Sequence, residues 1–432
     1  MQTEEQSVSH ALNELCVFLD PKKGVIKTVR RIYEYSDDPK FYNYGAILTE
    51  CSPDKYENEL SNSTSGFSFF SEEEALLKCL GESLERDAVR RFQSNNFITG
   101  SVSELQENVI DIKSIVTFSN SQFLEKRFSH VKFNDKTPFS WIKGKNEMSN
   151  KEVLIPAQLV YLSYKPIEKE KYIYLPTTSG LAGGGTYTSA LVRSILENIE
   201  RDSFLLHYLS KKSGMKINLS KIKSKKVQKL VSYIRSYNLE VVCCVLMTEL
   251  EIPTYLTIII NRTGVGPALS LGMKTDLNPV EAILGSIQEA LHTRGWIRNI
   301  VEKEPGRLIN VNLKRIEKLD DRAILWYGKD KIELLDFFIN GGEKELEVKE
   351  KNFDFKSKLS ILKNALKKNN MDLFSINVTP RYLDKYNFKV VKSIIPQLQP
   401  FYLIEEYPCW GGDRLRKLLG TKNINKFPQP FL

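Results

Sequence analysis

A thirteen-residue pattern that occurs twice is the feature that most constrains the fold of this chain. Residues 75–87 read ALLKCLGESLERD and residues 190–202 read ALVRSILENIERD, so that corresponding positions lie 115 apart. A third segment, 282–294, keeps the alanine and the first glutamate and shifts the arginine by one position. An apolar stripe with helical spacing runs through the first two copies, at Leu76, Leu80 and Leu84 and at Leu191, Ile195 and Ile199. The repeat predicts one fold with internal duplication.

Strand patterns accompany these helical segments and predict an α/β fold class. Segments rich in Val, Ile, Tyr and Phe are typical of strands. Ser71 with Glu74 three residues later predicts a helix start with a capping box. Residues 342–370 are highly charged and predict an exposed helical excursion. We expect strands at residues 42–48, 172–175, 240–247, 255–260, 373–378 and 389–394.

The composition predicts a globular protein of the cytoplasm. Hydrophobic residues make up 41% of the 432 positions and charged residues 27%, both ordinary values. The start of the chain is polar and acidic, so we expect no secretory signal. The apolar run at residues 241–247 is too short to span a membrane. None of the six cysteines forms a Cys-x-x-Cys pair, which argues against a zinc site and predicts buried thiols.

Part of the net charge of +9 is concentrated in residues 211–235. Such a basic stripe can bind nucleic acid or an acidic leader peptide. The segment contains few aromatic residues, which makes a nucleic-acid partner unlikely, and a solvated helix and loop is the favoured interpretation. The lysines concerned are Lys211, Lys212, Lys216, Lys221, Lys223, Lys225, Lys226 and Lys229.

The paired glutamates of the repeat predict a metal site. Glu82 and Glu85 share one face of a helix, and Glu197 and Glu200 repeat this arrangement. Two carboxylates about 5 Å apart repel each other by roughly 3 kcal/mol at an effective dielectric constant near 20. Two such pairs brought together therefore need a cation, and Mg²⁺ takes oxygen ligands and shares its shell with substrate phosphates. We expect the four carboxylates to converge on one magnesium–nucleotide site.

The alternative is that each helix carries an ordinary surface ion pair. Arg86 follows Glu82 by four residues, and Arg201 follows Glu197 by the same spacing, which is common on exposed helices. The glutamate face also carries small and apolar residues, which favour a second, partly enclosed surface. These residues are Ala75, Val89, Ala190 and Phe204.

A glycine-rich segment precedes the second copy. Residues 172–186 read YIYLPTTSGLAGGGT and run from an expected strand into the helix. Glycines let backbone N–H groups approach an anion near a helix N-terminus. The segment matches neither the Walker A nor the Rossmann pattern, and a flexible turn is the alternative. Its place directly before residues 197–201 favours a nucleotide-binding role.

Together these motifs resemble the YcaO family, and in particular its azoline-forming branch. The resemblance covers most of the chain. Three positions depart from the family pattern: Gly185 stands where Asn or Asp is common, Ser189 replaces an acidic residue, and His292 replaces Gln. The tail keeps two prolines but ends in Phe-Leu. The matching segments are TSGLAGG at 178–184, ENIERD at 197–202, GESLER at 81–86, EALHTR at 289–294, PQLQP at 396–400, GDRL at 412–415 and the tail 427–432.

The resemblance implies a YcaO-type α/β fold in which duplicated helix–sheet units surround a central site for ATP and Mg²⁺. It implies a single domain over residues 1–432, with an N-terminal part (1–64), an ATP-binding core (65–310), a charged excursion (311–370) and C-terminal strands with a tail (371–432). The metal ligands would be Glu82, Glu85, Glu197 and Glu200, and the catalytic residues Arg86, Arg201, Arg294, Pro428 and Pro430. The nucleotide would be bound by Ser179, Gly180, Ala182, Gly183, Gly184, Gly185, Thr186, Ser189 and Glu289.

The implied reaction is ATP-dependent cyclodehydration of a ribosomally made precursor peptide, in which Cys, Ser or Thr becomes a thiazoline or oxazoline. The implied partners are the precursor peptide and a separate leader-binding protein that resembles ubiquitin-activating enzymes, because residues 1–64 are too few for that domain and look like part of the fold. A flavin dehydrogenase is a further candidate, in a homodimer or hetero-complex. Thioamide or amidine formation is one alternative. A non-catalytic scaffold is the other, favoured by Gly185 and Ser189.

Overall fold

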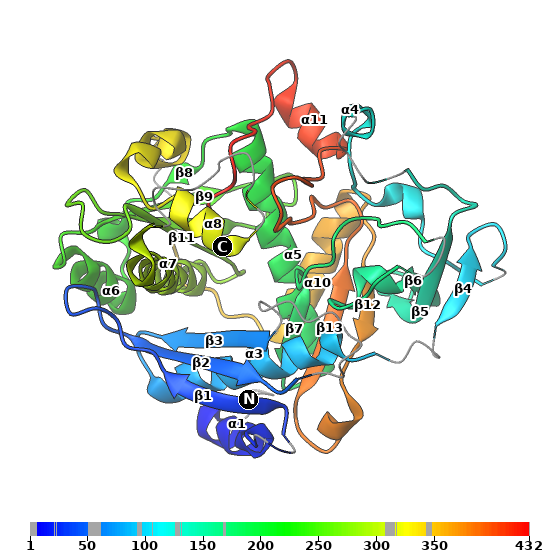
Figure 1. Ribbon diagram of the computed structural model, residues 1–432, viewed down its shortest axis with the longest axis horizontal. Coiled ribbons are helices and arrows are strands. Elements are labelled where there is room, and N and C mark those ends of the chain that lie inside the picture. Colours follow the sequence, from blue (N-terminus) through cyan, green and yellow to red (C-terminus); the bar gives the residue numbers. More distant parts are fainter. Residues whose placement is uncertain are drawn as a thin grey trace.

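Three antiparallel sheets and three long helices dominate the described part of the chain (Figure 1). Each helix carries one copy of the repeated pattern: α3 (Glu72–Arg90), α5 (Tyr187–Ser210) and α7 (Pro279–Lys303). This mixture confirms the predicted α/β class. The computed structural model describes all residues except 1–6, 21, 23, 51–61, 93–96, 106, 126–129, 131, 167–169, 307–315, 317, 343–347 and 432.

The first unit is α3 on a three-stranded sheet in the order β1-β2-β3. Gly66 allows the helix to approach β3 closely, because a Cβ atom there would lie 2.1 Å from the backbone nitrogen of Cys79. The strands are β1 (Ile26–Arg31), β2 (Tyr42–Leu48) and β3 (Ser63–Ser68).

The second unit is α5 on a six-stranded sheet in the order β4-β5-β12-β13-β7, with β6 paired to the outside of β5. The helix packs mainly on β13 and β7, and it stands near the centre of the molecule in Figure 1. The strands are β4 (Ile98–Ser101), β5 (Pro138–Asn146), β6 (Glu152–Pro156), β7 (Leu181–Gly184), β12 (Phe374–Asn377) and β13 (Lys389–Ile394).

The third unit is α7 on a four-stranded sheet in the order β11-β10-β9-β8. The expected strands at residues 240–247 and 255–260 are confirmed here, and those at 42–48, 373–378 and 389–394 are confirmed in the other two sheets, each to within one residue. The strands are β8 (Met215–Lys216), β9 (Glu240–Leu246), β10 (Thr254–Ile260) and β11 (Leu269–Thr275).

Shorter helices fill the periphery. The lysine-rich α6 buries Leu230 and Ile234 against β9 and leaves its lysines exposed, as expected for a solvated face. These helices are α1 (Val8–Leu15), α4 (Asn120–Phe123), α6 (Lys225–Arg235), α8 (Leu319–Leu325), α9 (Asp336–Ile339), α10 (Phe355–Lys368) and α11 (Asp413–Leu419). The 3₁₀ turns are η1 (Cys16–Phe18), η3 (Ile112–Ser114), η4 (Ala157–Leu159), η5 (Leu219–Lys221), η7 (Lys329–Leu335) and η8 (Arg381–Leu383).

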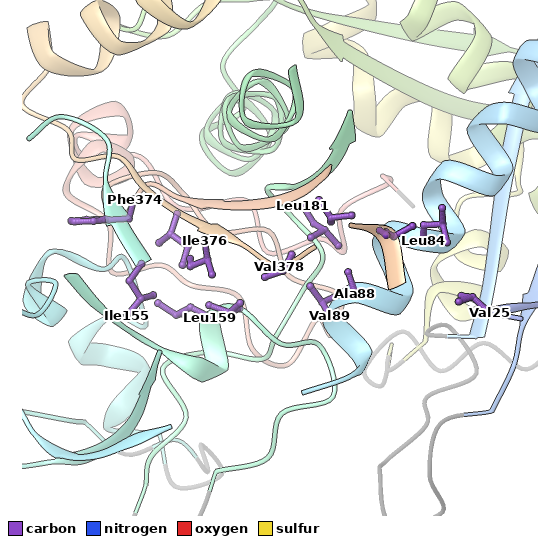
Figure 2. Close-up of a cluster of buried hydrophobic side chains, with 14 of the residues drawn as sticks. Val25, Leu84, Ala88, Val89, Ile155, Leu159, Leu181, Phe374, Ile376 and Val378 are labelled. Atoms are coloured by element: carbon purple, nitrogen blue, oxygen red, sulfur yellow. The ribbon is translucent and has the colours of Figure 1, made fainter. Parts of the chain in front are cut away.

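A shared hydrophobic core joins the first unit to the second. Figure 2 shows Leu84 and Val89 of α3 in the same cluster as Leu181 of β7 and Ile376 of β12. The first predicted stripe packs into this cluster through Leu80 and Leu84, whereas the second, at Leu191, Ile195 and Ile199, packs into a separate buried cluster. Leu76 lies at the margin of the first cluster and is only partly buried. No helix in the described residues is both long and apolar enough to cross a membrane.

Three expectations about local structure need correction. The strand expected at residues 172–175 is wrong, because the N–H of Ile173 donates to the side chain of Gln158 and no ladder forms. The strand before α5 is β7, which the glycine segment itself provides. Ser71 caps α3 as predicted, but the capping box is not completed, since Glu74 Oε2 instead accepts a hydrogen bond from Ser68 Oγ at 2.7 Å.

The predictions for the charged segment and for the cysteines are confirmed only in part. The helix expected within residues 342–370 is confirmed as α10. The predicted exposure of this helix is wrong at Leu362 and Leu366, which are fully buried against α5. Residues 343–347 of that segment lie outside the described part. Cys16 is exposed, contrary to expectation, and Cys51 also lies outside the described residues. The confirmed buried thiols are those of Cys79, Cys243, Cys244 and Cys409.

The close helix–sheet contact in the third unit predicts a stability difference between two glycines. A Cβ atom at Gly272 of β11 would lie 2.2 Å from the backbone nitrogen of Ala290 in α7, whereas one at Gly295 of α7 meets no atom nearer than 4.0 Å. We expect Gly272→Ala to lower the free energy of unfolding by about 1–3 kcal/mol or more. Gly295→Ala should be neutral or stabilising by up to about 1 kcal/mol. Urea unfolding checks both, and equal stabilities would contradict this packing.

Candidate active site

The first glutamate of each repeat is held by a backbone N–H of its own unit. Glu82 accepts a hydrogen bond from Ser65 N in β3 at 3.1 Å. Glu197 accepts one from Gly180 N at 3.1 Å, and Glu289 one from Met273 N in β11 at 2.5 Å. The three helices therefore carry three equivalent glutamates, each anchored to the strand segment on which its helix lies.

The second glutamate of a repeat reaches across to the next unit. Glu85 of α3 accepts a hydrogen bond from Gly183 N in β7 at 2.6 Å. Glu200 of α5 accepts one from Thr275 N in β11 at 2.7 Å. The first unit thus contacts the second, and the second contacts the third, through chemically equivalent bonds.

The third unit returns to the first, which closes a ring of three. His292 occupies the position of the second glutamate, and its ring stacks on Phe67 of β3 with centroids 4.3 Å apart. One residue before Glu289, Gln288 Oε1 accepts a hydrogen bond from Phe69 N at 2.8 Å. Burial lowers the pKa of His292 to about 4, so this seam is uncharged at neutral pH. At this seam an aromatic stack takes the place that Glu85 and Glu200 have at the other two seams.

The carboxylates form one electrostatic cluster. Burial raises the pKa of Glu85 to about 8, the Gly183 N–H opposes the rise, and the charges of Glu82 and Glu197 add to it. Burial also raises the pKa of Glu200 to about 8, with Lys274 opposing and Glu289 and Glu197 adding. Carboxyls that shift one another's pKa in this way lie close together. The two glutamate pairs therefore lie near each other, and their convergence on one magnesium–nucleotide site stays a prediction.

Water reaches this cluster from one side. The side chains of Glu82 and Glu197 are 36% and 28% accessible, whereas Glu200 is 5% accessible. Burial still raises the pKa of Glu82, and the charge of Glu197 adds to that rise while Arg86 opposes it. Glu82 and Glu197 are therefore more accessible to water than Glu200. The second enclosed surface predicted beside the glutamates is confirmed, since Ala75, Val89, Ala190 and Phe204 are all buried.

The glycine segment contacts the glutamates directly. A Cβ atom at Gly183 would lie 2.8 Å from Glu85 Oε1 and 2.3 Å from the ring of Phe388, so only glycine lets Glu85 reach this backbone. Gly180 has a φ of +76°, the left-handed region that favours glycine. The expectation that backbone N–H groups approach an anion here is met by the protein's own carboxylates. Ala182 and Gly184 complete strand β7 beside them.

Helix α5 begins directly after the glycine segment. Thr186 is its N-cap and forms a capping box with Ser189, whose hydroxyl accepts a hydrogen bond from Thr186 N at 3.1 Å. Ser189 therefore stabilises the start of the helix. A Cβ atom at Gly185 would meet no atom nearer than 3.8 Å, so this position has free space.

The three predicted arginines have different surroundings. Arg86 forms an ion pair with Glu82 at 3.0 Å, and Arg201 lies 3.8 Å from Glu197. Arg294 forms a buried ion pair with Asp38 at 2.8 Å and donates to the carbonyl oxygen of Pro267 at 2.6 Å. The structure thus brings Arg86 and Arg201 to the carboxylates, whereas Arg294 fixes the N-terminal segment to α7. Its assigned role at the phosphates stays a prediction.

Arg201 is held between two aromatic rings. Its guanidinium carbon lies 4.4 Å from the ring centroid of Phe431 and 4.9 Å from that of Phe401, and the two rings are perpendicular to each other. These cation–π contacts fix the guanidinium while its Nε and Nη1 atoms have no hydrogen-bond partner among the described residues. A fixed guanidinium with unused donors is suited to bind an anion.

The C-terminal tail that supplies Phe431 is anchored through its backbone. The carbonyl oxygen of Pro428 accepts hydrogen bonds from Tyr208 at 3.0 Å and from Trp326 at 3.1 Å. That of Phe431 accepts one from Arg322 at 3.0 Å. Pro430 is buried between these anchors. The tail therefore forms part of the wall beside Arg201, and the catalytic roles assigned to its two prolines stay predictions.

Sequence reasoning missed several residues of the site. Lys392 lies buried in β13 and donates to the carbonyl oxygens of Thr177 at 2.9 Å and Ser179 at 2.7 Å, which fixes the approach to Gly180. Burial lowers its pKa to about 8, and Glu197 opposes this shift. Arg193 donates to the carbonyl oxygen of Gly183 at 3.0 Å. A lysine within an otherwise apolar strand pattern is the sequence signal that could have identified Lys392.

These residues fit magnesium and a nucleotide phosphate. Among the described residues, no three His, Cys, Asp or Glu side chains lie close enough together to hold a metal ion by themselves. Mg²⁺ needs no such cage, because it is usually held by one or two carboxylates together with substrate phosphates and water. The partly accessible Glu82 and Glu197 have the required oxygen atoms, and Arg201 has unused donors.

Comparisons with known proteins agree with this site. Residues 69–399 match the family described as YcaO cyclodehydratase, ATP- and Mg²⁺-binding. An uncharacterized protein of Methanothermobacter thermautotrophicus is 25% identical over 160 residues, which are 37% of this chain and 42% of that protein.

Three solved structures share the fold. A heterocyclase in complex with substrate and cofactor has a TM-score of 0.81 at 18% identity, over 100% of this chain and 59% of that chain. YcaO from Methanopyrus kandleri bound with AMPPCP and Mg²⁺ has a TM-score of 0.64 at 12% identity, over 94% and 95% of the two chains. The Escherichia coli microcin synthetase McbBCD complex has a TM-score of 0.64 at 14% identity, over 95% and 99%. This chain thus spans 59% of the first heterocyclase's length.

The shifted carboxyls predict how stability depends on pH. Glu85 and Glu200 hold a proton up to a pKa of about 8 in the folded chain, above their ordinary value of 4.5. Their contribution to stability is complete below that ordinary value and is lost as pH rises through about 8. Without metal, we expect the melting temperature to fall from about pH 5 to pH 8.5. Glu200→Gln should make this fall smaller.

The control is Glu281→Gln, which changes an exposed carboxylate in the first turn of α7 and should keep the wild-type dependence. Calorimetry in the presence of a chelator measures all three proteins. An identical pH dependence in the Glu200 variant and the wild type would show that Glu200 does not titrate as described.

Proposed function

This chain belongs to the YcaO family, whose members bind ATP and Mg²⁺, and on that premise we propose that it is an ATP-dependent peptide cyclodehydratase. Its substrate is a ribosomally made precursor peptide, in which Cys, Ser or Thr becomes a thiazoline or oxazoline. The observation that carries the proposal is the cluster of buried carboxylates beside an arginine with unused donors.

The chemistry explains why such a cluster suffices. The side chain of the reacting residue attacks the preceding amide carbon, the carbonyl oxygen takes the γ-phosphoryl group of ATP, and phosphate leaves as the C=N bond of the ring forms. The amide oxygen is a poor leaving group until it is phosphorylated. Phosphoryl transfer depends on positioning and on neutralising charge, so it needs no protein nucleophile.

The roles that we propose for these residues follow their order along α5. The glycine strand and the start of the helix form one end, the glutamates lie in the middle, and Arg201 directly follows Glu200. Bound Mg²⁺ would supply positive charge between the carboxylates and the phosphates. Glu82 and Glu197 would hold it, while Arg86 would keep Glu82 oriented through their ion pair. Arg201 would then face the phosphoryl group that is transferred.

A non-catalytic scaffold is the second candidate, and one observation favours it. Neither Gly185 nor Ser189 brings a carboxylate to the start of α5, and the Ser189 hydroxyl is occupied by the helix cap. Such a chain would keep the fold and the ring of three units but would not turn over ATP. The measurement of ATP hydrolysis separates the two candidates.

Glu200→Gln tests the catalytic proposal. Glutamine keeps the acceptor for the Thr275 N–H, so the fold should persist, but it cannot lose a proton and become charged when Mg²⁺ binds. We expect ATP turnover to drop by about a hundredfold or more, in line with the loss of one key electrostatic group. Glu281→Gln should retain full turnover. Unchanged ATP hydrolysis in the Glu200 variant would count against the assignment.

Dependence on a partner is the second consequence. Strands β1, β2 and β3 form the sheet under α3, so residues 26–31, 42–48 and 63–68 are part of the fold that carries Glu82 and Glu85. One structural relative is a complex of several proteins, McbBCD. We propose that a separate leader-binding protein, similar to ubiquitin-activating enzymes, tethers the precursor and raises its local concentration toward the millimolar range. A flavin dehydrogenase would oxidise the ring afterwards.

We expect slow, leader-independent ring formation by this chain alone and strong stimulation by the leader-binding partner. Mass spectrometry of the precursor measures it as the loss of one water per ring, with and without the partner and with a leaderless precursor as the control. Equal rates with and without the partner, together with leader dependence in the single chain, would show that this chain recognises the leader itself.

A further inference from the structure

The proposed function leaves the basic stripe at residues 211–235 unused. The chain has 62 Lys and Arg residues against 53 Asp and Glu residues. Nine of these bases and none of these acids lie in the stripe, so the remaining 53 bases balance the 53 acids. This one segment therefore carries the whole net charge of +9. A surface of one sign attracts partners of the opposite sign.

Helix α6 presents part of this charge to solvent. Lys225, Lys226 and Lys229 are exposed on one side of the helix, while Leu230 on the other side is buried. Among the described residues, none of these three lysines forms an ion pair with an acid, and Lys226 instead lies 5.8 Å from the ring centroid of Phe70. The positive charge of α6 is thus not neutralised within the described part of the chain.

An open groove lies between the end of α6 and the start of β9. Its volume is about 630 Å³, which is within the range of sites that hold a ligand or part of a partner. Two of the nine bases, Lys216 and Arg235, belong to its lining. The acidic residue of the lining, Glu240, already forms an ion pair with Arg262 at 2.7 Å. The groove therefore combines positive charge with space for part of a partner.

The groove also runs along a strand that is not fully paired. β8 pairs with only two residues of β9, Cys244 and Val245. Residues 240–242 of β9 have no strand partner on that side among the described residues, and they line the groove. An extended protein segment can add to such an edge through backbone hydrogen bonds.

The same face offers little to the bases of a nucleic acid. Proteins that bind single strands stack the bases on exposed aromatic rings. Tyr233 is the aromatic residue of the stripe, and it is partly buried with its hydroxyl 3.1 Å from that of Tyr237. The open strand edge and the lack of an exposed ring both favour a protein partner.

We propose that α6 and the adjoining groove form a docking face for the leader-binding partner protein, which binds it through an acidic, extended segment. The inference rests on the proposed function, which requires such a partner, and it adds where that partner binds and what charge it carries. Figure 1 shows α6 at the left edge of the molecule, whereas α5 with its glutamates stands at the centre. The docking face is therefore separate from the candidate active site.

A triple variant, Lys225→Glu, Lys226→Glu and Lys229→Glu, tests the docking face. Charge complementarity acts mainly on the rate of association, and salt screens it. At about 50 mM NaCl we expect the association rate constant with the partner, measured by stopped-flow fluorescence, to fall about tenfold or more. The difference should shrink at about 500 mM NaCl. ATP hydrolysis without the partner should be unchanged, because these lysines lie outside the candidate active site.

The matched control is Lys356→Glu, Lys367→Glu and Lys417→Glu. These lysines are exposed on α10 and α11, and their replacement changes the net charge of the chain by the same amount. The control should associate with the partner at close to the wild-type rate. Equal association rates for the two triple variants at low salt would overturn the docking face.

A second measurement uses the wild-type chain and so does not depend on a variant. A carbodiimide joins lysine amines to carboxylates that are in contact, and mass spectrometry then identifies the linked residues. We expect links from lysines of residues 211–229 to Asp or Glu of the partner. Links confined to lysines elsewhere would overturn the proposal. So would tighter binding of a labelled oligonucleotide of twelve deoxythymidines than of the partner, which would identify a nucleic-acid surface.

Ring formation, measured separately, distinguishes the docking face from the proposed function. Partner binding that depends on Lys225, Lys226 and Lys229, without ring formation in any precursor, leaves the docking face standing and removes the cyclodehydratase proposal. Ring formation that the partner stimulates equally in the wild type and in the α6 triple variant, at every partner concentration, does the reverse.

Discussion

The structure depends on burying several carboxylates next to one another. Like charges in a protein interior repel strongly, and each also loses its hydration. Here every one of the five clustered carboxylates receives a backbone N–H, and the donors come from strand segments of all three units. Because the bonds of Glu85 and Glu200 cross between units, the site cannot be assembled from one unit alone. The remaining repulsion is what a cation would relieve.

This constraint accounts for features that otherwise look unrelated. The glycine segment forms a strand without a side chain at Gly183, because Glu85 must reach the backbone there. The third unit ends in a stack of His292 on Phe67, which closes the ring without adding a sixth carboxyl group. The tail is tied down by its carbonyl oxygens, and so Phe431 can hold Arg201 at the edge of the cluster.

The sequence predicted those parts of the site that belong to the repeated helices. The identity of the four glutamates, the helices that carry them and their enclosed face all follow from spacing and polarity. The sequence could not show which backbone N–H each glutamate meets, because those bonds join segments up to 98 residues apart. It likewise gave no sign that Gln399, nearly two hundred residues after Arg201, shares a cavity with it. The sequence did not predict strand β7 within the glycine segment, because its pairing with β13 is a long-range contact.

The central claim is that the glutamates of α3 and α5 hold one cation together with a nucleotide phosphate. The most direct test is a crystal structure with AMPPCP and Mn²⁺, in which anomalous scattering locates the metal. The account predicts Mn²⁺ bound between the Glu82–Glu85 pair and the Glu197–Glu200 pair, with the terminal phosphate within hydrogen-bond distance of Arg201. Mn²⁺ and nucleotide bound away from these carboxylates, or a nucleotide that leaves the Arg201 donors unpaired, would contradict it.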